Sequence, residues 1–210
     1  STPKPSSAAS DVYKRQKVDF ALDGPIPWAN AEVGQSPTVH IGGSAAEIWE
    51  SENAVARGRI SDRPYVLSVQ PSVFDPSRAP EGKAVLWAYI HVPQGSDLDA
   101  TELVTRQVER FAPGFRDLIL AHHSVPASSR EAINPSEIGG DILGGAFTIP
   151  QALRRPVLGT APWRTPMRGV YLASASTPPG PGVNGMAGWH AARTALKDAG
   201  ARVSLGDLFG

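Results

Sequence analysis

Several short segments of the chain alternate apolar and polar residues, which is the pattern of β-strands that bury one face. Turns rich in glycine and proline separate these segments, for example residues 23–27 and the Gly42-Gly43 pair. A mainly apolar run near the end of the chain has the length of a further strand. The pattern predicts strands over 18–22, 38–41, 65–69, 83–92, 115–125 and 170–174.

Three other stretches have helical periodicity. The first covers 45–57, and its apolar stripe consists of Ile48, Trp49, Val55 and Ala56. In the second, Asp99 and Glu102 have the spacing of a capping box, and Pro113-Gly114 ends the helix. Its apolar face consists of Leu103, Val104, Val108 and Phe111. The third is an alanine-rich segment, 186–199.

The order of these elements is irregular and does not repeat a βαβ unit. We therefore expect an α+β fold in which helices pack on a mostly antiparallel sheet. Within that sheet, 65–69 and 83–92 should pair antiparallel. No internal repeat is visible in the sequence.

Composition excludes several classes of protein. Lys plus Arg and Asp plus Glu number 20 each, so the chain lacks the basic excess of an electrostatic nucleic-acid binder. The longest apolar run, 85–90, is far shorter than the roughly 18 residues of a membrane span. The sequence has no cysteine, which excludes disulfides, thiolate metal sites and a cysteine nucleophile. The 21 glycines and 20 prolines indicate long ordered loops, since 41% hydrophobic residues argue against disorder.

The first sixteen residues differ from the rest of the chain. Residues 1–10 are rich in Ser, Pro and Ala, and 11–16 form a short charged run without a following apolar segment. This string resembles residues translated from a sequencing adaptor, and the alternative is a disordered native N-terminus. Either interpretation leaves 1–16 outside the fold. Because no secretory signal is recognisable, we expect a cytoplasmic protein.

Gly180, Gly182 and Gly185 satisfy the G-x-G-x-x-G spacing of dinucleotide-binding loops, between a predicted strand and a predicted helix. Two features argue against a complete fingerprint. Residues 176–179 separate the strand from the first glycine, and few residues follow the helix for a second strand. A tight Gly/Pro turn is the alternative. Small residues would nevertheless let a ligand approach the backbone where helix amides begin.

The end of the chain reads Val170-Tyr-Leu-Ala-Ser-Ala-Ser-Thr-Pro-Pro-Gly-Pro-Gly-Val-Asn-Gly185. It resembles the C-terminal flavin signature of phytoene-dehydrogenase-related FAD oxidoreductases, L-Y-L-x-G-A-S-T-H-P-G-G-G-V-x-G. The branch it resembles most is that of the pyridine nucleotide-disulfide oxidoreductase domain-containing proteins. Further stretches agree with this family, in order along the chain: 75–82, 134–145, Gln151, Arg155-Pro156 and 163–166.

The resemblance implies a domain organisation and a cofactor. Residues 17–168 would form a substrate-binding domain, and 169–200 the C-terminal strand and helix of a Rossmann-type FAD/NAD(P)-binding domain, followed by a tail, 201–210. The N-terminal Rossmann half of the same protein, which holds the FAD pyrophosphate, would lie outside this chain. The chain alone is then expected to be inactive.

The resemblance also assigns site residues. The isoalloxazine ring would lie against Gly182, Val183, Asn184, Gly185 and Met186, and the ribityl and phosphate region against Ser174 and Ala175. A helix N-terminus beside the ring would favour the reduced anion, by roughly 0.3–1 kcal/mol or more. The sequence departs from the family pattern at Ser174, Pro178 and Pro181.

Other candidate residues have simple structural alternatives. The family places Asp141 near flavin and substrate, but a turn aspartate is equally consistent with its loop. Phe147 and Trp163 could line a substrate pocket, or pack in the core. Arg154-Arg155 is interpreted as a solvated face. His122 and His123 should face opposite sides of a strand, which argues against a shared metal, and we expect no metal site.

The function implied by the resemblance is hydride transfer from an apolar or small amine- or alkene-like substrate to flavin N5. Two alternatives stay open. The first is a non-catalytic module on a flavoprotein-like fold that binds a lipid or a partner protein. The second is an α+β domain in which 180–185 is only a structural turn.

Overall fold

The computed structural model describes residues 14–143, 149–182 and 184–201, which divide into two compact units, 14–142 and 143–201. The division between 142 and 143 lies upstream of residue 168, the predicted end of the substrate-binding domain.

The larger unit is built on a five-stranded sheet with the order β2-β3-β4-β1-β5. Every neighbouring pair is antiparallel. This confirms the antiparallel α+β prediction, including the pairing of 65–69 with 83–92. The strands are β1 (Lys14–Leu22), β2 (Thr38–Ile41), β3 (Val66–Val69), β4 (Ala84–Val92) and β5 (Ile119–Val125).

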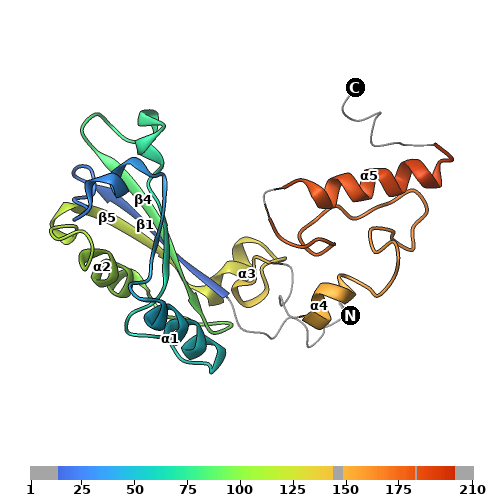
Figure 1. The fold of residues 1–210 in the computed structure, drawn as a ribbon, viewed down its shortest axis with the longest axis horizontal. Helices are drawn as coiled ribbons and strands as arrows, with labels where there is room; N and C mark the ends of the chain where they lie inside the picture. Colours follow the sequence, from blue (N-terminus) through green and yellow to red (C-terminus); the bar gives the residue numbers. More distant parts are fainter. Residues whose placement is uncertain (1–13, 144–148, 183, 202–210) are drawn as a thin grey trace. The chain divides into compact units, whose positions relative to one another are not determined.

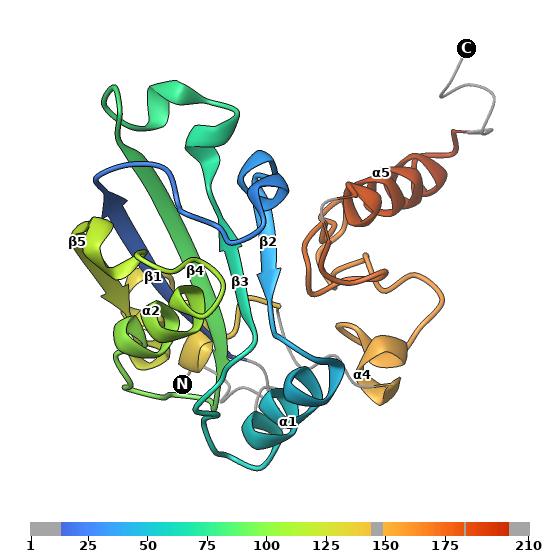
Figure 2. The same cartoon turned by 60° about the vertical axis from the view of Figure 1, so that its left-hand side comes forward.

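Strict alternation along β1 and β4 gives the sheet one fully buried face. Figure 2 shows helix α2 (Thr101–Glu109) in front of the sheet, and it contacts β4 and β5. Val104 and Val108 of α2 are completely buried in this core, and Phe20 meets Phe115 edge to face at 5.5 Å. The remaining apolar core residues of the sheet include Val18, Leu22, Val66, Leu86, Ala88, Ile90 and Val92.

Strand β1 begins at Lys14, so the expectation that 1–16 lies outside the fold is wrong for residues 14–16. Ladder hydrogen bonds involve only the backbone, so the polar side chains of residues 14–16 do not prevent β1 from pairing with β4 as far as Val92. The buried Lys14 amine also finds a carboxylate, Asp141, at 3.2 Å.

Helix α1 (Ala45–Ala56) begins with a complete capping box, in which Ser44 and Glu47 cap each other's backbone amides. Its predicted stripe is only partly correct, because Val55 is buried but Trp49 is 67% exposed. Helix α2 has no capping box. Asp99 instead accepts hydrogen bonds from the amide and hydroxyl of Thr101, and Glu102 pairs with Arg116.

Short helical turns fill the connections. They are η2 (Ala31–Gln35), η3 (Pro71–Val73), η4 (Pro76–Arg78), η5 (Arg116–Leu118), η6 (Ala127–Ser129), α3 (Arg130–Ile133) and η7 (Ile138–Gly140). Because η5 occupies the start of the segment predicted as a strand over 115–125, β5 begins only at Ile119.

The smaller unit contains helices α4 (Ile149–Arg154) and α5 (Met186–Asp198), and α5 confirms the predicted helix at 186–199 (Figure 1). The predicted strand at 170–174 is wrong. In that part of the described chain only Tyr171 forms a bridge, to Arg164. Val170 and Leu172 are 43% and 38% exposed, so the apolar run packs on no neighbouring strand among the described residues. The helix of the expected strand and helix is therefore present, but the strand is not, and the Rossmann-type assignment is not confirmed.

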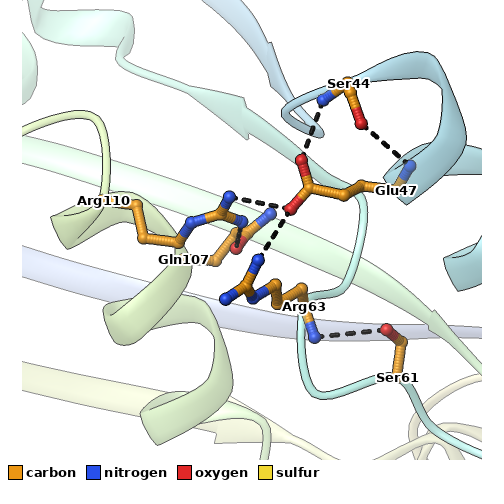
Figure 3. A network of polar contacts seen from close by, with 6 residues as sticks. All are labelled: Ser44, Glu47, Ser61, Arg63, Gln107 and Arg110. Carbon is orange, nitrogen blue, oxygen red and sulfur yellow. Dashed lines mark hydrogen bonds and ion pairs between the residues drawn. The ribbon is translucent and has the colours of Figure 1, made fainter.

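A polar network around Glu47 connects three segments of the larger unit (Figure 3). The Glu47 carboxylate accepts hydrogen bonds from the Ser44 amide, from Arg63 before β3 and from Arg110 after α2. Arg110 also donates to Gln107. The Ser44 amide first, and then Arg110 and Arg63, lower the pKa of Glu47 from 4.5 to about 2.

This network predicts a pH-dependent contribution to stability. A carboxyl whose pKa is lowered by folding stabilises the protein above its unfolded pKa, and the contribution is lost as the pH falls from 4.5 toward 2. We expect Glu47→Gln to lower the urea midpoint at pH 7 and to have a progressively smaller effect between pH 4.5 and pH 2. Glu50→Gln, on the same helix and outside the network, is the matched control. Equal effects of the two variants at pH 7 would contradict the prediction.

Candidate functional site

The loop before α5 places glycines where a bulky neighbour could approach the backbone. Gly185 is the N-cap of α5 in the left-handed conformation (φ 66°), and a Cβ added there would meet nothing within 4 Å. At Gly182 (φ 156°) a Cβ would lie 2.7 Å from the side-chain amide nitrogen of Asn184, so the open space is confined to Gly185. The segment around Gly185 therefore has open space in front of a helix start.

The first turn of α5 supplies hydrogen-bond donors at the same place. The Asn184 side chain accepts from the Met186 amide at 2.9 Å. The amides of Ala187 and Gly188 have no acceptor within the helix, as at every helix N-terminus. Gly182, Asn184, Gly185 and Met186 are all exposed. The arrangement is electropositive and accessible, which suits an electron-rich group.

Ser174 and Ala175, expected beside the ribityl and phosphate region, belong to a turn whose polar groups already form hydrogen bonds within the protein. The Ser174 hydroxyl contacts that of Ser176 at 2.6 Å, and the Ser174 carbonyl accepts from Thr177. The Ala175 carbonyl accepts from Arg155 at 2.7 Å.

Arg155 corrects the interpretation of Arg154-Arg155 as a solvated face. Arg154 is exposed, but Arg155 is 4% exposed and also donates to the Leu143 carbonyl at 3.0 Å. Arg155 can be buried because the carbonyl oxygens of Leu143 and Ala175 accept its hydrogen bonds. These acceptors are distant in the sequence, so the pattern at 154–155 does not reveal them. Two other candidates, Val183 and Phe147, lie outside the described residues.

Trp163 is half-buried against α5. Its indole N–H donates to the Pro178 carbonyl at 3.0 Å, and its ring stacks on His190 with centroids 4.7 Å apart and planes at 16°. Trp189 meets the same imidazole edge to face, with centroids 4.7 Å apart. Trp163 thus connects the 160s segment to both the glycine loop and α5.

A second link to α5 is ionic. Asp198 accepts from Arg164 at 2.5 and 2.8 Å and from the Tyr171 hydroxyl at 2.9 Å. Arg164, and then Tyr171, lower the pKa of Asp198 from 3.8 to about 2.

Asp141 is 6% exposed, lies in the larger unit and pairs with Lys14 at 3.2 Å. The structure therefore places Asp141 and Trp163, two of the predicted pocket residues, in different compact units.

The second face of the sheet carries an aromatic row that the sequence analysis did not single out. Trp87, Tyr89 and His91 alternate with buried residues on β4, so all three point to the face opposite the core. Trp87 stacks on Tyr89 at 6.1 Å and 20°. The row continues from His91 through Tyr65 to His40 on β2. The period-two pattern of 83–92 contained this signal, since every odd position from 87 to 91 is aromatic.

Two hydrogen-bonded acid–base pairs lie in this aromatic row. Glu52 of α1 contacts His91 Nδ1 at 3.0 Å, and the Tyr65 hydroxyl contacts His40 Nδ1. Burial raises the pKa of Tyr65 and of Tyr89. Across β1, Asp19 is opposite His123, while Phe20 is opposite His122. The two histidines therefore face opposite sides of the sheet, as predicted.

The described residues contain no group of three or more metal-ligating side chains close enough to hold an ion. None of their helices is long and apolar enough to cross a bilayer.

Comparison with known proteins shows relatives among oxidoreductases. Over 153 residues the chain is 31% identical to the mouse and the rat pyridine nucleotide-disulfide oxidoreductase domain-containing protein 2, which covers 67% of this chain. Over 145 residues it is 31% identical to 4,4'-diapolycopen-4-al dehydrogenase of Metabacillus indicus, covering 65%. The chain spans about a quarter of the length of these relatives (26–27%). No protein-family profile matches the sequence.

The Trp163 contacts predict a measurable stability difference. Trp163→Phe keeps a ring to stack on His190 but removes the donor to Pro178, and losing one such hydrogen bond costs about 1 kcal/mol. Trp49→Phe, at a 67% exposed position, should change the free energy of unfolding by less than about 0.5 kcal/mol. Urea unfolding followed by circular dichroism measures both. Indistinguishable midpoints would show that the Trp163 contact contributes nothing.

Proposed function

We propose that the chain is part of an FAD-dependent oxidoreductase that removes a hydride from an apolar or small amine- or alkene-like substrate. The observation that carries the proposal is the start of α5. There, a left-handed Gly185 faces open space beside helix amides, in the same stretch that resembles a flavin signature. Relatedness to proteins named as oxidoreductases supports it.

The residues at this helix start fit one end of the cofactor. Gly182, Val183, Asn184, Gly185 and Met186 would lie against the isoalloxazine ring, where the amides of the first turn favour negative charge on reduction. A bound flavin supplies the hydride acceptor at N5. The chain's own contribution is to let the ring approach the backbone, because Gly185 has no side chain in the way.

The turn at Ser174 and Ala175 fits less well. Its hydroxyl and carbonyl groups already bond to Ser176, Thr177 and Arg155. These two residues would border the ribityl chain rather than bind phosphate. Most of the pyrophosphate contacts would then come from the N-terminal Rossmann half of a longer protein, in line with the share of its relatives that the chain covers.

For the substrate we propose the aromatic face of the sheet in the larger unit. Trp87 and Tyr89 present stacked, half-buried rings, and the flanking Leu67 and Val69 of β3 are opposite them in the register. The Arg15 guanidinium lies 4.2 Å from the centre of the Tyr89 ring and the Lys17 ammonium 5.8 Å from that of Trp87. A ligand that displaces these long side chains would meet rings that can bind apolar groups. Asp141 has no part in this proposal, because Lys14 neutralises it. A pocket role for Phe147 and Trp163 stays a prediction.

The same aromatic face also favours the second candidate, a non-catalytic module that binds a lipid or partner. The oxidoreductase and the non-catalytic module differ in whether the protein binds a flavin. An oxidoreductase purifies with flavin in the longer protein and is bleached anaerobically by its substrate, whereas a binding module shows neither.

Gly185 provides the test of the flavin site. In the full-length protein that carries this chain, we expect Gly185→Val to abolish flavin retention while circular dichroism stays unchanged. Gly200→Val is the matched control, because Gly200 also has a left-handed backbone (φ 80°) and open space, but lies after the end of α5. The flavin-to-protein absorbance ratio of the purified variants decides. An unchanged ratio in Gly185→Val contradicts the site.

The aromatic face can be tested separately with the 210-residue chain. We expect the neutral fluorophore N-phenyl-1-naphthylamine to bind, and Tyr89→Ala to weaken binding roughly threefold to tenfold through the lost ring contact. Trp49→Ala, which removes an exposed ring from α1, should leave affinity unchanged. Fluorescence titration measures both variants. Equal affinity in Tyr89→Ala and the wild type would argue against this face.

A further inference from the structure

A small hollow lies along the flank of α5, away from its N-terminus. Its volume is about 260 Å³. All of its lining residues belong to the smaller unit, and none of them is acidic. They are Thr160, Ala161, Trp163, Arg164, His190, Arg193, Thr194 and Lys197.

Two exposed cations of this hollow, Arg193 and Lys197, have no ion-pair partner within 4 Å among the described residues, although Lys197 also attracts the neighbouring Asp198. Arg193 and Lys197 are four residues apart, so they lie on the same face of α5. Neither side chain forms an ion pair with any residue that the structure describes. The third cation, Arg164, uses its Nε and Nη2 atoms on Asp198. With the adjoining Asp198 counted against the three cations, the hollow has an excess of two positive charges.

The wall of the hollow is held in place by aromatic packing. His190 contacts both Trp163 and Trp189, with each ring centroid 4.7 Å from its own. The Arg193 guanidinium is 5.2 Å from the Trp189 ring, which holds it beside the helix. A site whose cations are partly positioned in advance loses less conformational entropy when it binds an ion.

We propose that this hollow binds a phosphate group. A guanidinium matches the geometry of phosphate oxygens and an ammonium adds a point charge, so Arg193 and Lys197 together suit a doubly charged anion better than a single carboxylate. The Thr160 hydroxyl can donate a further hydrogen bond. The volume accommodates a phosphate with part of the molecule that carries it. This site goes beyond the proposed flavin contact at Gly185 and does not depend on it.

Binding of inorganic pyrophosphate to the 210-residue chain tests the proposal. In isothermal calorimetry at fixed ionic strength, we expect Arg193→Gln to weaken binding about tenfold, the effect of one charge-assisted hydrogen bond. Lys197→Gln should weaken it as well, although Lys197 in the last turn also compensates the helix dipole. Arg168→Gln, the same change at an exposed arginine outside the hollow, is the matched control and should leave binding unchanged.

Three outcomes would overturn the proposal: no binding of pyrophosphate at millimolar concentration, equal affinities for Arg193→Gln and Arg168→Gln, or citrate binding as tightly as pyrophosphate. Comparison of inorganic phosphate with adenosine monophosphate identifies the source of the group. Tighter binding of the nucleotide indicates a phosphomonoester ligand, and equal binding indicates that the phosphate alone is recognised. In either case a shift of the Trp163 indole N–H resonance, which Arg193→Gln abolishes, places the anion in the hollow.

Discussion

Backbone pairing between β1 and β4 determines the arrangement of the larger unit. Nine consecutive residues of each strand face one another, from Lys14 and Val92 to Leu22 and Ala84, across more than sixty residues of intervening chain. Strict register makes one face apolar, where α2 and Phe115 complete the core. The same register directs Trp87, Tyr89 and His91 to the other face. The core and the aromatic row are therefore two consequences of one ladder, and a slip by one residue would exchange them.

The sequence predicted the strands well where alternating apolar and polar residues lie beside a neighbouring strand in the fold. Strands β2, β3 and β4 were expected to within one residue, as were α1 and α5, whereas β1 and β5 each differ from the prediction by four residues at the start. The run 170–174 shows the limit of such inference. Its apolar composition resembles a strand, but a strand also requires neighbours, and only Arg164 bridges to it in the described chain. Local composition contains no information about that partner.

The candidate site was predictable to a similar extent. The helix start at Gly185 follows from the glycine spacing and the alanine-rich segment after it. The partners of Asp141, Arg155 and Asp198 do not, because each bonds to residues from 12 to 127 positions away in the sequence. Trp49 was predicted to belong to the apolar stripe of α1 but is 67% exposed. A helical stripe shows which side chains share a face of the helix, but not how far along that face the packing extends. The aromatic row on β4 could be predicted, because the alternation of buried and half-buried residues along 84–92 assigns Trp87, Tyr89 and His91 to the second face of the sheet.

The two units are stabilised by different kinds of contact. In the larger unit, Val18, Val66, Ala88, Ile90, Val104 and Phe115 are completely buried. Among the described residues after 142, Ala191 is the one apolar side chain with under 9% exposure, apart from prolines, and Leu158 and Ile149 are about four-fifths exposed. The smaller unit depends on polar and ring contacts. Arg155 and Trp163 donate to backbone carbonyls, Trp163 also stacks on His190, and Asp198 accepts from Arg164 and Tyr171.

This difference has a consequence for amide hydrogen exchange. Strands flank β1 on both sides at 17–22 and β4 at 87–90, so the amide protons of these segments exchange with solvent only when the whole unit opens. The amides of α5 need only the loss of a few side-chain contacts and a brief unwinding. A deuterium pulse would therefore label 186–198 early and leave 17–22 and 87–90 protected, which divides the chain into an early- and a late-exchanging part. Added salt would accelerate only the early part, because it weakens the Arg164–Asp198 pair but not the apolar core.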